Sequence, residues 1–262
     1  MVSGLSTVFV TAVFATALGL QNPPAQTANG FRPPAPDKTA APDAPRNLTP
    51  EVRGDIFIAR KMYREAIETY LTGPKDSPVL ANKTGIAYHQ LLDLTDAKKN
   101  YERAIKLNGS YAEAINNLGT VFYAQKSYRR AISQYKKALL ITPESASILS
   151  NLGTAYFARK NYTDAFAMYQ HALQIDPQVF ERRSSQGVLL QERSVEERAK
   201  FHYYMAKTYA KAGMTELALT YIRKALEEGF KERDKFTKDP EFATLKDNPE
   251  FKLLLATEQK VL

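Results

Sequence analysis

Apolar residues recur along this chain at the three- and four-residue spacing of helices that bury one face. Within residues 112–125, Ile115 and Phe122 fall on the same side of a predicted helix. Within residues 129–141, Tyr135 lies on the apolar side of a second predicted helix. The pattern therefore predicts a hairpin of two amphipathic helices joined by a short turn.

The same pattern returns at a period of about 34 residues. Equivalent residues in three successive copies are Gly85, Gly119 and Gly153; Ala97, Ala131 and Ala165; Tyr101, Tyr135 and Tyr169; and Ala104, Ala138 and Ala172. Such a period is typical of stacked helical hairpins, each too small to bury its own apolar face. A glycine inside a helix costs about 0.5–1 kcal/mol relative to alanine, so its recurrence predicts a close approach between two helices.

Residues 116–143 and 150–177 share a further pattern of small, aromatic and closing-proline positions (NNLGTVFY to LLITP and SNLGTAYF to LQIDP). Both stretches resemble the tetratricopeptide repeat, with Ile115 and Leu149 standing where the family has a tryptophan. The resemblance implies an all-α, right-handed superhelical solenoid of about five helical hairpins. Solenoids of this kind mostly bind other proteins.

The repeat register divides the chain into segments. The predicted solenoid covers residues 48–229, with units near 47–77, 78–111, 112–145, 146–179 and 199–229, an insert at 180–198, and capping helices at 230–262. The insert is either a tolerated loop or a loop that contacts a ligand, and from Ser194 onward it is expected to lengthen the next helix. In the tail, two similar motifs predict short helices whose apolar side chains seal the last repeat, namely Phe242, Leu245, Phe251 and Leu254.

Local capping signals predict where several helices begin and end. Gly229 is expected to close the last long helix. The predicted starts are Ser110 with Glu113, Ser194 with Glu197, Thr142 before Pro143, and Asp176 before Pro177.

The first 28 residues are uncharged and apolar, with an Ala15-Thr16-Ala17 cleavage pattern. They predict a secretory signal peptide, followed at 29–47 by a linker rich in Pro and Ala. The expected location is therefore secreted or periplasmic. The alternatives are a membrane anchor formed by residues 5–20, or neither.

The residue types needed for catalysis or metal binding do not assemble in this sequence. The chain has no Cys, and its three histidines fall in different repeats without paired acidic residues. These histidines are His89, His171 and His202. We therefore expect no enzyme activity, no catalytic residue, no metal, no cofactor and no small-molecule substrate.

The net charge of +8 admits two interpretations. Four cationic side chains occupy equivalent places near the ends of second helices: Arg103, Lys137, His171 and Lys224. They either complement helix dipoles on a solvated outer face or form a basic ladder for acidic partners.

In the family that the repeats resemble, first helices line a concave groove. The positions expected to face it, exposed, are Asn82, Lys83, His89, Asn116, Asn117, Thr120, Tyr123, Ser150, Asn151, Thr154, Phe157, Tyr203 and Lys207. Asparagines there suit an extended peptide backbone, aromatics bury side chains, and Lys83 and Lys207 suit a carboxylate. Alternatively, Asn117 and Asn151 only follow the repeat consensus.

These observations predict a non-enzymatic scaffold that binds a peptide or partner protein in the groove, outside the cytoplasm. We expect no nucleic acid partner and no stable membrane span in the mature chain. The alternative hypothesis is a basic adaptor that binds anionic envelope polymer, lipid or nucleic acid through its convex surface.

Overall fold

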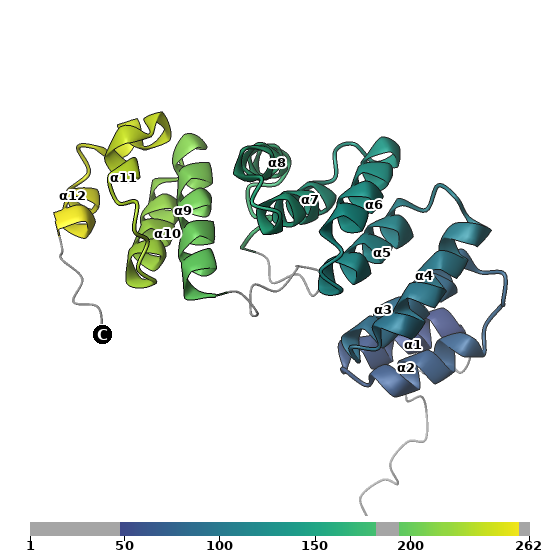
Figure 1. Ribbon diagram of the computed structural model, residues 1–262. Coiled ribbons are helices and arrows are strands. Elements are labelled where there is room, and N and C mark those ends of the chain that lie inside the picture. The colour runs from purple at the N-terminus through teal and green to yellow at the C-terminus, as the bar shows by residue number, and fades with distance from the viewer. Residues whose placement is uncertain (1–47, 182–193, 257–262) are drawn as a thin grey trace, which may run out of the picture. The chain divides into compact units, whose positions relative to one another are not determined.

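The computed structural model describes residues 48–181 and 194–256, which all lie within one compact unit (Figure 1). The predicted signal peptide, the linker and most of the insert lie outside the described residues. The described helices are α1 (Pro50–Ala59), α2 (Tyr63–Leu71), α3 (Pro78–Gln90), α4 (Leu94–Leu107), α5 (Ala112–Ala124), α6 (Tyr128–Ile141), α7 (Ala146–Ala158), α8 (Tyr162–Ile175), α9 (Val195–Lys211), α10 (Thr215–Glu227), α11 (Lys235–Lys238), the 3-10 helix η1 (Pro240–Leu245) and α12 (Pro249–Ala256).

Consecutive helices pair into five hairpins, from α1–α2 to α9–α10, and three short helices follow. The second helix of one hairpin packs on the first helix of the next, as α4 packs on α5 and α6 on α7. The predicted all-α fold of about five hairpins with a helical C-terminal cap is therefore confirmed.

Every hairpin turns in the same way. The first helix ends with one residue in the left-handed backbone region: Lys61, Leu92, Lys126, Lys160 and Gly213. The next N–H then donates back to a carbonyl five residues earlier, as Ser127 does to Phe122 at 2.8 Å and Met214 to Tyr209 at 2.9 Å. This closure satisfies carbonyls that a helix end leaves free, and it sets the sharp reversal into the second helix.

The recurring glycines permit the close approach that the sequence predicted. A methyl group added at Gly119 would lie 2.6 Å from the ring of Tyr135, and one at Gly153 would lie 2.6 Å from Tyr169. Gly54 with Tyr70 and Gly85 with Tyr101 repeat the arrangement. Each tyrosine ring therefore fills the space that its glycine leaves.

The fifth hairpin uses a different pair at the same positions. Ala206 takes the glycine position and Ile222 the tyrosine position, and both side chains are fully buried. The methyl group gained on the first helix is thus matched by a smaller side chain on the second. Helix α9 has 17 residues, compared with 13 in α7, in agreement with the predicted lengthening from Ser194.

The C-terminal segments close the last hairpin around Tyr203. Its ring stacks on Phe230 at 4.5 Å between ring centroids and meets Phe236 edge-on at 5.4 Å. The predicted cap residues Phe242, Leu245 and Phe251 are buried, and Leu254 is half-buried.

The structure confirms some predicted helix ends and overturns others. Ser194 accepts the N–H of Glu197, and Gly229 ends the last long helix with φ of +79°. The prediction for Ser110 is wrong, because Ser110 bonds to Asn108 and α5 starts after Tyr111. Thr142 and Asp176 are also wrong as starting caps, because they end α6 and α8 instead.

Candidate functional site

The predicted groove residues separate into two groups by burial. Lys83, His89, Thr120, Tyr123, Ser150 and Lys207 are half-buried. The expectation of exposure is wrong for the others, which are buried: Asn82, Asn116, Asn117, Asn151, Thr154, Phe157 and Tyr203. Most of the predicted polar ladder thus lies inside the protein, between neighbouring helices.

The buried asparagines bond to one another from hairpin to hairpin. Asn151 Nδ2 donates to Asn116 Oδ1 at 3.0 Å, and Asn117 Nδ2 donates to Asn82 Oδ1 at 3.0 Å. Asn116 Nδ2 also lies 3.4 Å from Asn117 Oδ1, which joins the two pairs. Because an amide both donates and accepts, this chain satisfies groups that would be costly to bury alone.

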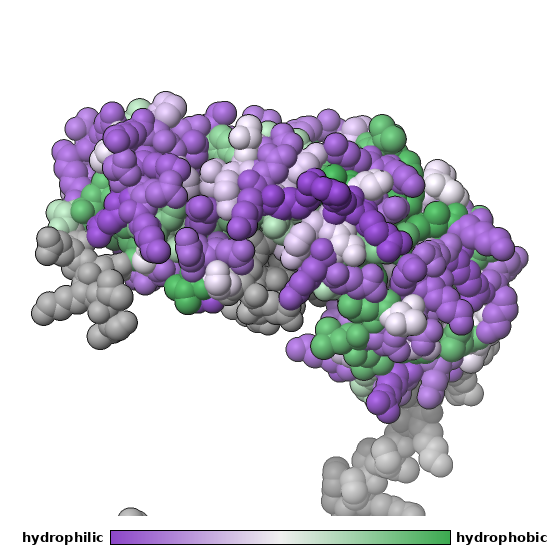
Figure 2. All heavy atoms as spheres, viewed as in Figure 1, coloured by the Kyte–Doolittle hydropathy of each residue, from purple (hydrophilic) through white to green (hydrophobic). Residues whose placement is uncertain are grey.

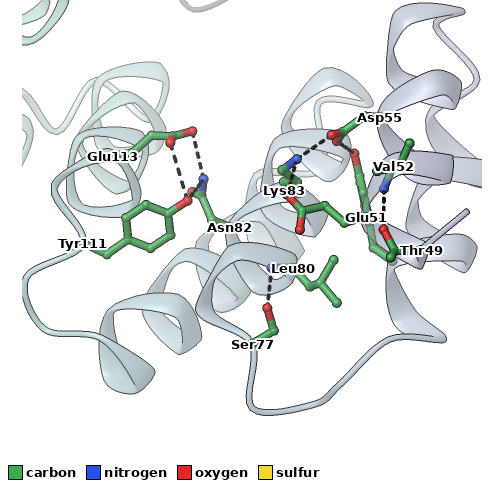
Figure 3. Close-up of polar contacts among 11 residues, drawn as sticks. Thr49, Glu51, Val52, Asp55, Ser77, Leu80, Asn82, Lys83, Tyr111 and Glu113 are labelled. Carbon is green, nitrogen blue, oxygen red and sulfur yellow. Dashed lines mark hydrogen bonds and ion pairs between the residues drawn. The ribbon is translucent and has the colours of Figure 1, made fainter.

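The network ends at a carboxylate. Asn82 Nδ2 donates to Glu113 Oε1 at 3.0 Å, and the Tyr111 hydroxyl lies close to both residues (Figure 3). The bonded asparagines are 35 residues apart, whereas the repeat places equivalent residues 34 apart. The helices therefore pack with a stagger that no single-repeat pattern reveals.

Lys83 is held by two carboxylates of the preceding first helix. Its Nζ lies 2.6 Å from Asp55 and 2.9 Å from Glu51, both in α1 (Figure 3). Burial opposes the charge, but the hydrogen bonds from Asp55 and Glu51 raise the pKa of Lys83 above its usual value. Asp55 also accepts the Tyr70 hydroxyl at 2.7 Å. The charge of Lys83 is therefore already balanced within the fold.

Lys207 is held in the same way at the other end of the stack. Its Nζ lies 2.9 Å from Asp239 and 3.2 Å from Glu241, both in the C-terminal cap. The Tyr203 hydroxyl donates to Asp239. Although burial opposes the charge, the bonds from Tyr203 and Lys207 lower the pKa of Asp239. The prediction that Lys83 and Lys207 meet a ligand carboxylate is thus replaced by two internal clamps.

Aromatic contacts replace the amide network between α7 and α9. The buried Phe157 meets Phe201 edge-on at 5.5 Å and Tyr204 at 6.0 Å between centroids. Tyr204 stacks on Tyr162 at 5.1 Å. In the repeat register Tyr204 is the counterpart of Asn151, so a ring stands where the regular hairpins have an amide.

Five half-buried residues remain on the first helices without an internal ion pair among the described residues: Ile86, His89, Thr120, Tyr123 and Ser150. His89 lies edge-on to Tyr101 at 6.4 Å, and burial lowers its pKa. Tyr123 contacts the ring of Tyr128 at 5.2 Å. These side chains, from α3, α5 and α7, are the part of the predicted groove that retains partial exposure.

Sequence reasoning missed the acidic partners. Glu51 and Asp55 lie four residues apart, so one helix face presents both, and this spacing is a signal that the sequence offered. Asp239 and Glu241 were attributed only to a helix start, and Glu113 to a capping box. Which lysine each carboxylate meets depends on packing between elements far apart in the chain.

Three of the four predicted outer-face cations have local contacts. Arg103 donates to the carbonyl of Lys75, His171 lies 3.9 Å from Glu144, and Lys224 lies over the ring of Tyr221. Lys137 is exposed. This face therefore offers less free charge than the sequence suggested.

Comparison with known proteins agrees with the repeat pattern. The curated relative is the uncharacterized protein ycf37 of Porphyra purpurea, 31% identical over 88 residues, which are 29% of this chain. The match spans 51% of that relative, about half its length.

Solved structures also align, all with TM-scores below 0.5. MamA residues 41–end from Desulfovibrio magneticus RS-1 align at TM-score 0.48 and 18% identity, covering 72% of this chain and 95% of that one. The first TPR of Spaghetti (RPAP3) bound to an HSP90 peptide aligns at 0.41 and 24%, covering 42% and 90%.

Two family models match the central hairpins. The model described as TPR repeat matches residues 119–159, and the model described as Tetratricopeptide repeat matches residues 146–179. These matches cover the same stretches that carry the sequence resemblance and the paired helices of the structure. The chain therefore contains tetratricopeptide repeats within residues 119–179.

Proposed function

We propose that this protein is a non-enzymatic scaffold that binds a peptide or a partner protein along the first helices α3, α5 and α7. The observation that carries the proposal is the asparagine network, with three bonds of 3.0 to 3.4 Å joining these helices side by side. A surface held in place before binding loses less entropy when a ligand docks.

The two lysine clamps restrict the kind of ligand. Because Lys83 and Lys207 are each paired with two carboxylates, neither offers an unbalanced charge to a ligand carboxylate. The proposed contacts are the half-buried Ile86, Thr120 and Tyr123. Tyr123 supplies an aromatic surface and Thr120 a hydroxyl, which together suit an apolar side chain beside a peptide backbone.

A peptide selection tests this proposal. Peptides selected from a random library on the full chain should bind at least about tenfold more weakly to Thr120→Glu combined with Tyr123→Ala, because aromatic anchors carry much of the binding energy. The matched control is Ser133→Glu combined with Tyr63→Ala, which changes the same residue types on second helices. Equal losses in both variants, with unchanged circular dichroism, would refute the groove.

We also propose that the protein acts outside the cytoplasm. The support is the uncharged, apolar sequence of residues 1–28 and its A-x-A pattern. Among the described residues, no helix is long and apolar enough to cross a membrane. Amino-terminal sequencing of the native protein should find that the first 17–28 residues are missing, and a cytosolic protein that still starts at Met1 would contradict this.

A further inference from the structure

The connections between the helices form two edges of different charge. Turns inside hairpins lie at one edge of the stack and loops between hairpins at the other, because neighbouring helices alternate in direction. Figure 1 shows the α3–α4 and α5–α6 turns on one side and the α4–α5 and α6–α7 loops on the opposite side. The former set of connections is called the turn edge below.

Exposed cations gather at the turn edge. In the described turns at 60–62, 91–93, 125–127, 159–161 and 212–214, the cations are Arg60, Lys61, Lys126, Arg159 and Lys160, all exposed. None of them forms an ion pair with a described residue. The one carboxylate in these turns is Asp93, which caps α4 by accepting the N–H of Asp96 at 3.0 Å.

The opposite edge has the reverse balance. Its described loops, at 72–77, 108–111, 142–145 and 176–181, hold one cation, Lys75. The carboxylates in the same loops are Asp76, Glu144, Asp176 and Glu181. The two edges therefore differ in sign, and an anionic surface would attract the turn edge and repel the other.

A pair of leucines projects from the turn edge between the cations. Leu92 is 82% exposed and Leu91 is 39% exposed. Leu92 also has a φ of +61°, a backbone region that is uncommon for residues other than glycine. Figure 2 shows apolar atoms beside the α3–α4 turn on a largely hydrophilic face. The described fold therefore holds an apolar side chain in solvent at a strained position, with no burial to compensate.

We propose that the turn edge docks on the surface of an anionic lipid bilayer. Lys and Arg near such a surface are drawn to its negative potential, while projecting leucines enter the boundary between headgroups and acyl chains. A nucleic acid would use the cations but not the two leucines, so the combination favours lipid. This surface is distinct from the half-buried groove of α3, α5 and α7, and the two inferences fail independently.

Vesicle sedimentation of the full chain tests the proposal. The wild type should bind vesicles of phosphatidylglycerol in phosphatidylcholine, should lose this binding as salt is added, and should not bind phosphatidylcholine alone. Lys126→Glu with Lys160→Glu should reduce binding at least about tenfold, and Leu92→Ser should reduce it about threefold. Residues 5–20 are the same in every variant, so their own lipid affinity does not produce these differences.

The chain offers matched controls for both changes. Lys106→Glu with Lys137→Glu makes the same charge reversal on exposed second-helix positions, and Leu140→Ser changes a leucine that is 86% exposed near the opposite edge. These controls should bind as the wild type does. Equal losses in control and turn-edge variants would overturn the proposal, as would absence of wild-type binding. Loss of single-stranded RNA binding with unchanged vesicle binding would also overturn it.

Discussion

The three hairpins from α3 to α8 and the last hairpin, α9–α10, solve the same packing problem with different chemistry. The former pair glycine with tyrosine inside each hairpin and link first helices through asparagine amides. The last hairpin pairs Ala206 with Ile222 and meets its neighbour through the ring of Tyr204.

The difference follows from the repeat register. Amide hydrogen bonds need defined distances and angles, so they recur where the period is regular. The insert after residue 179 breaks that period, and aromatic contacts tolerate a wider range of geometries. Directional contacts therefore mark the regular part of this stack, and less directional contacts mark the part where the register shifts.

The largest expected effect comes from removing the cap of the last hairpin. Truncation after Gly229 removes the buried Phe236, Phe242 and Phe251 and leaves Tyr203 and Lys207 uncovered. Burial of each phenylalanine contributes about 1.5–3 kcal/mol, so the unfolding free energy should fall by more than about 5 kcal/mol. Thermal unfolding and light scattering should show a lower melting temperature and aggregation. A monomer with unchanged melting would contradict the capping role.

The glycine–tyrosine pairing should resist conversion to the pairing of the fifth hairpin one residue at a time. Gly119→Ala places a methyl group 2.6 Å from Tyr135, so it should cost about 1–3 kcal/mol despite the better helix propensity of alanine. In a Tyr135→Ile background the same change should be close to neutral, because this is the Ala206–Ile222 combination. Urea denaturation measures both costs, and equal costs would show that the two positions are independent.

The asparagine network should show coupling between hairpins. Asn151→Ala leaves Asn116 Oδ1 without its donor inside the protein, at a cost of about 1–2 kcal/mol. Asn116→Ala in the same protein should add less than its separate cost, because the two residues share one bond. Ser133→Ala, at an exposed site on α6, is the control and should change stability little. Additive losses would argue against the network.

The smallest expected effect is a pH dependence from His89 in the regular hairpins. Burial lowers the pKa of His89, so the unfolded chain takes up its proton first as the pH falls. The stabilising contribution is therefore complete above the unfolded pKa of about 6.5 and decreases at lower pH, by about 1 kcal/mol or less by pH 5.

A comparison with the last hairpin sharpens this test. His89→Phe should remove part of the stability loss between pH 7 and pH 5, measured by urea denaturation. His202 also has a lowered pKa from burial, but Glu228 at 2.8 Å acts in the opposite direction. If His89→Phe leaves the pH profile unchanged, the titration belongs to other groups.

The candidate site was predicted less completely than the fold. The spacing of residues such as Asn117 and Asn151 correctly placed them on first helices. It did not show whether each residue faces a groove or the neighbouring hairpin, because both directions lie on the same helix. Asn117 and Asn151 turn toward neighbouring hairpins, while Thr120 and Tyr123, one turn further along, retain partial exposure.

The sequence by itself determined the hairpin, its repetition and the close contact of glycine with tyrosine, since all three depend on spacing within one repeat. Only the tertiary structure decided the partners of Lys83 and Lys207, the 35-residue stagger of the asparagines and the charge difference between the edges. These features depend on the offset between separate hairpins. A repeating pattern specifies what each hairpin presents, and the packing of one hairpin on the next decides which side chains meet.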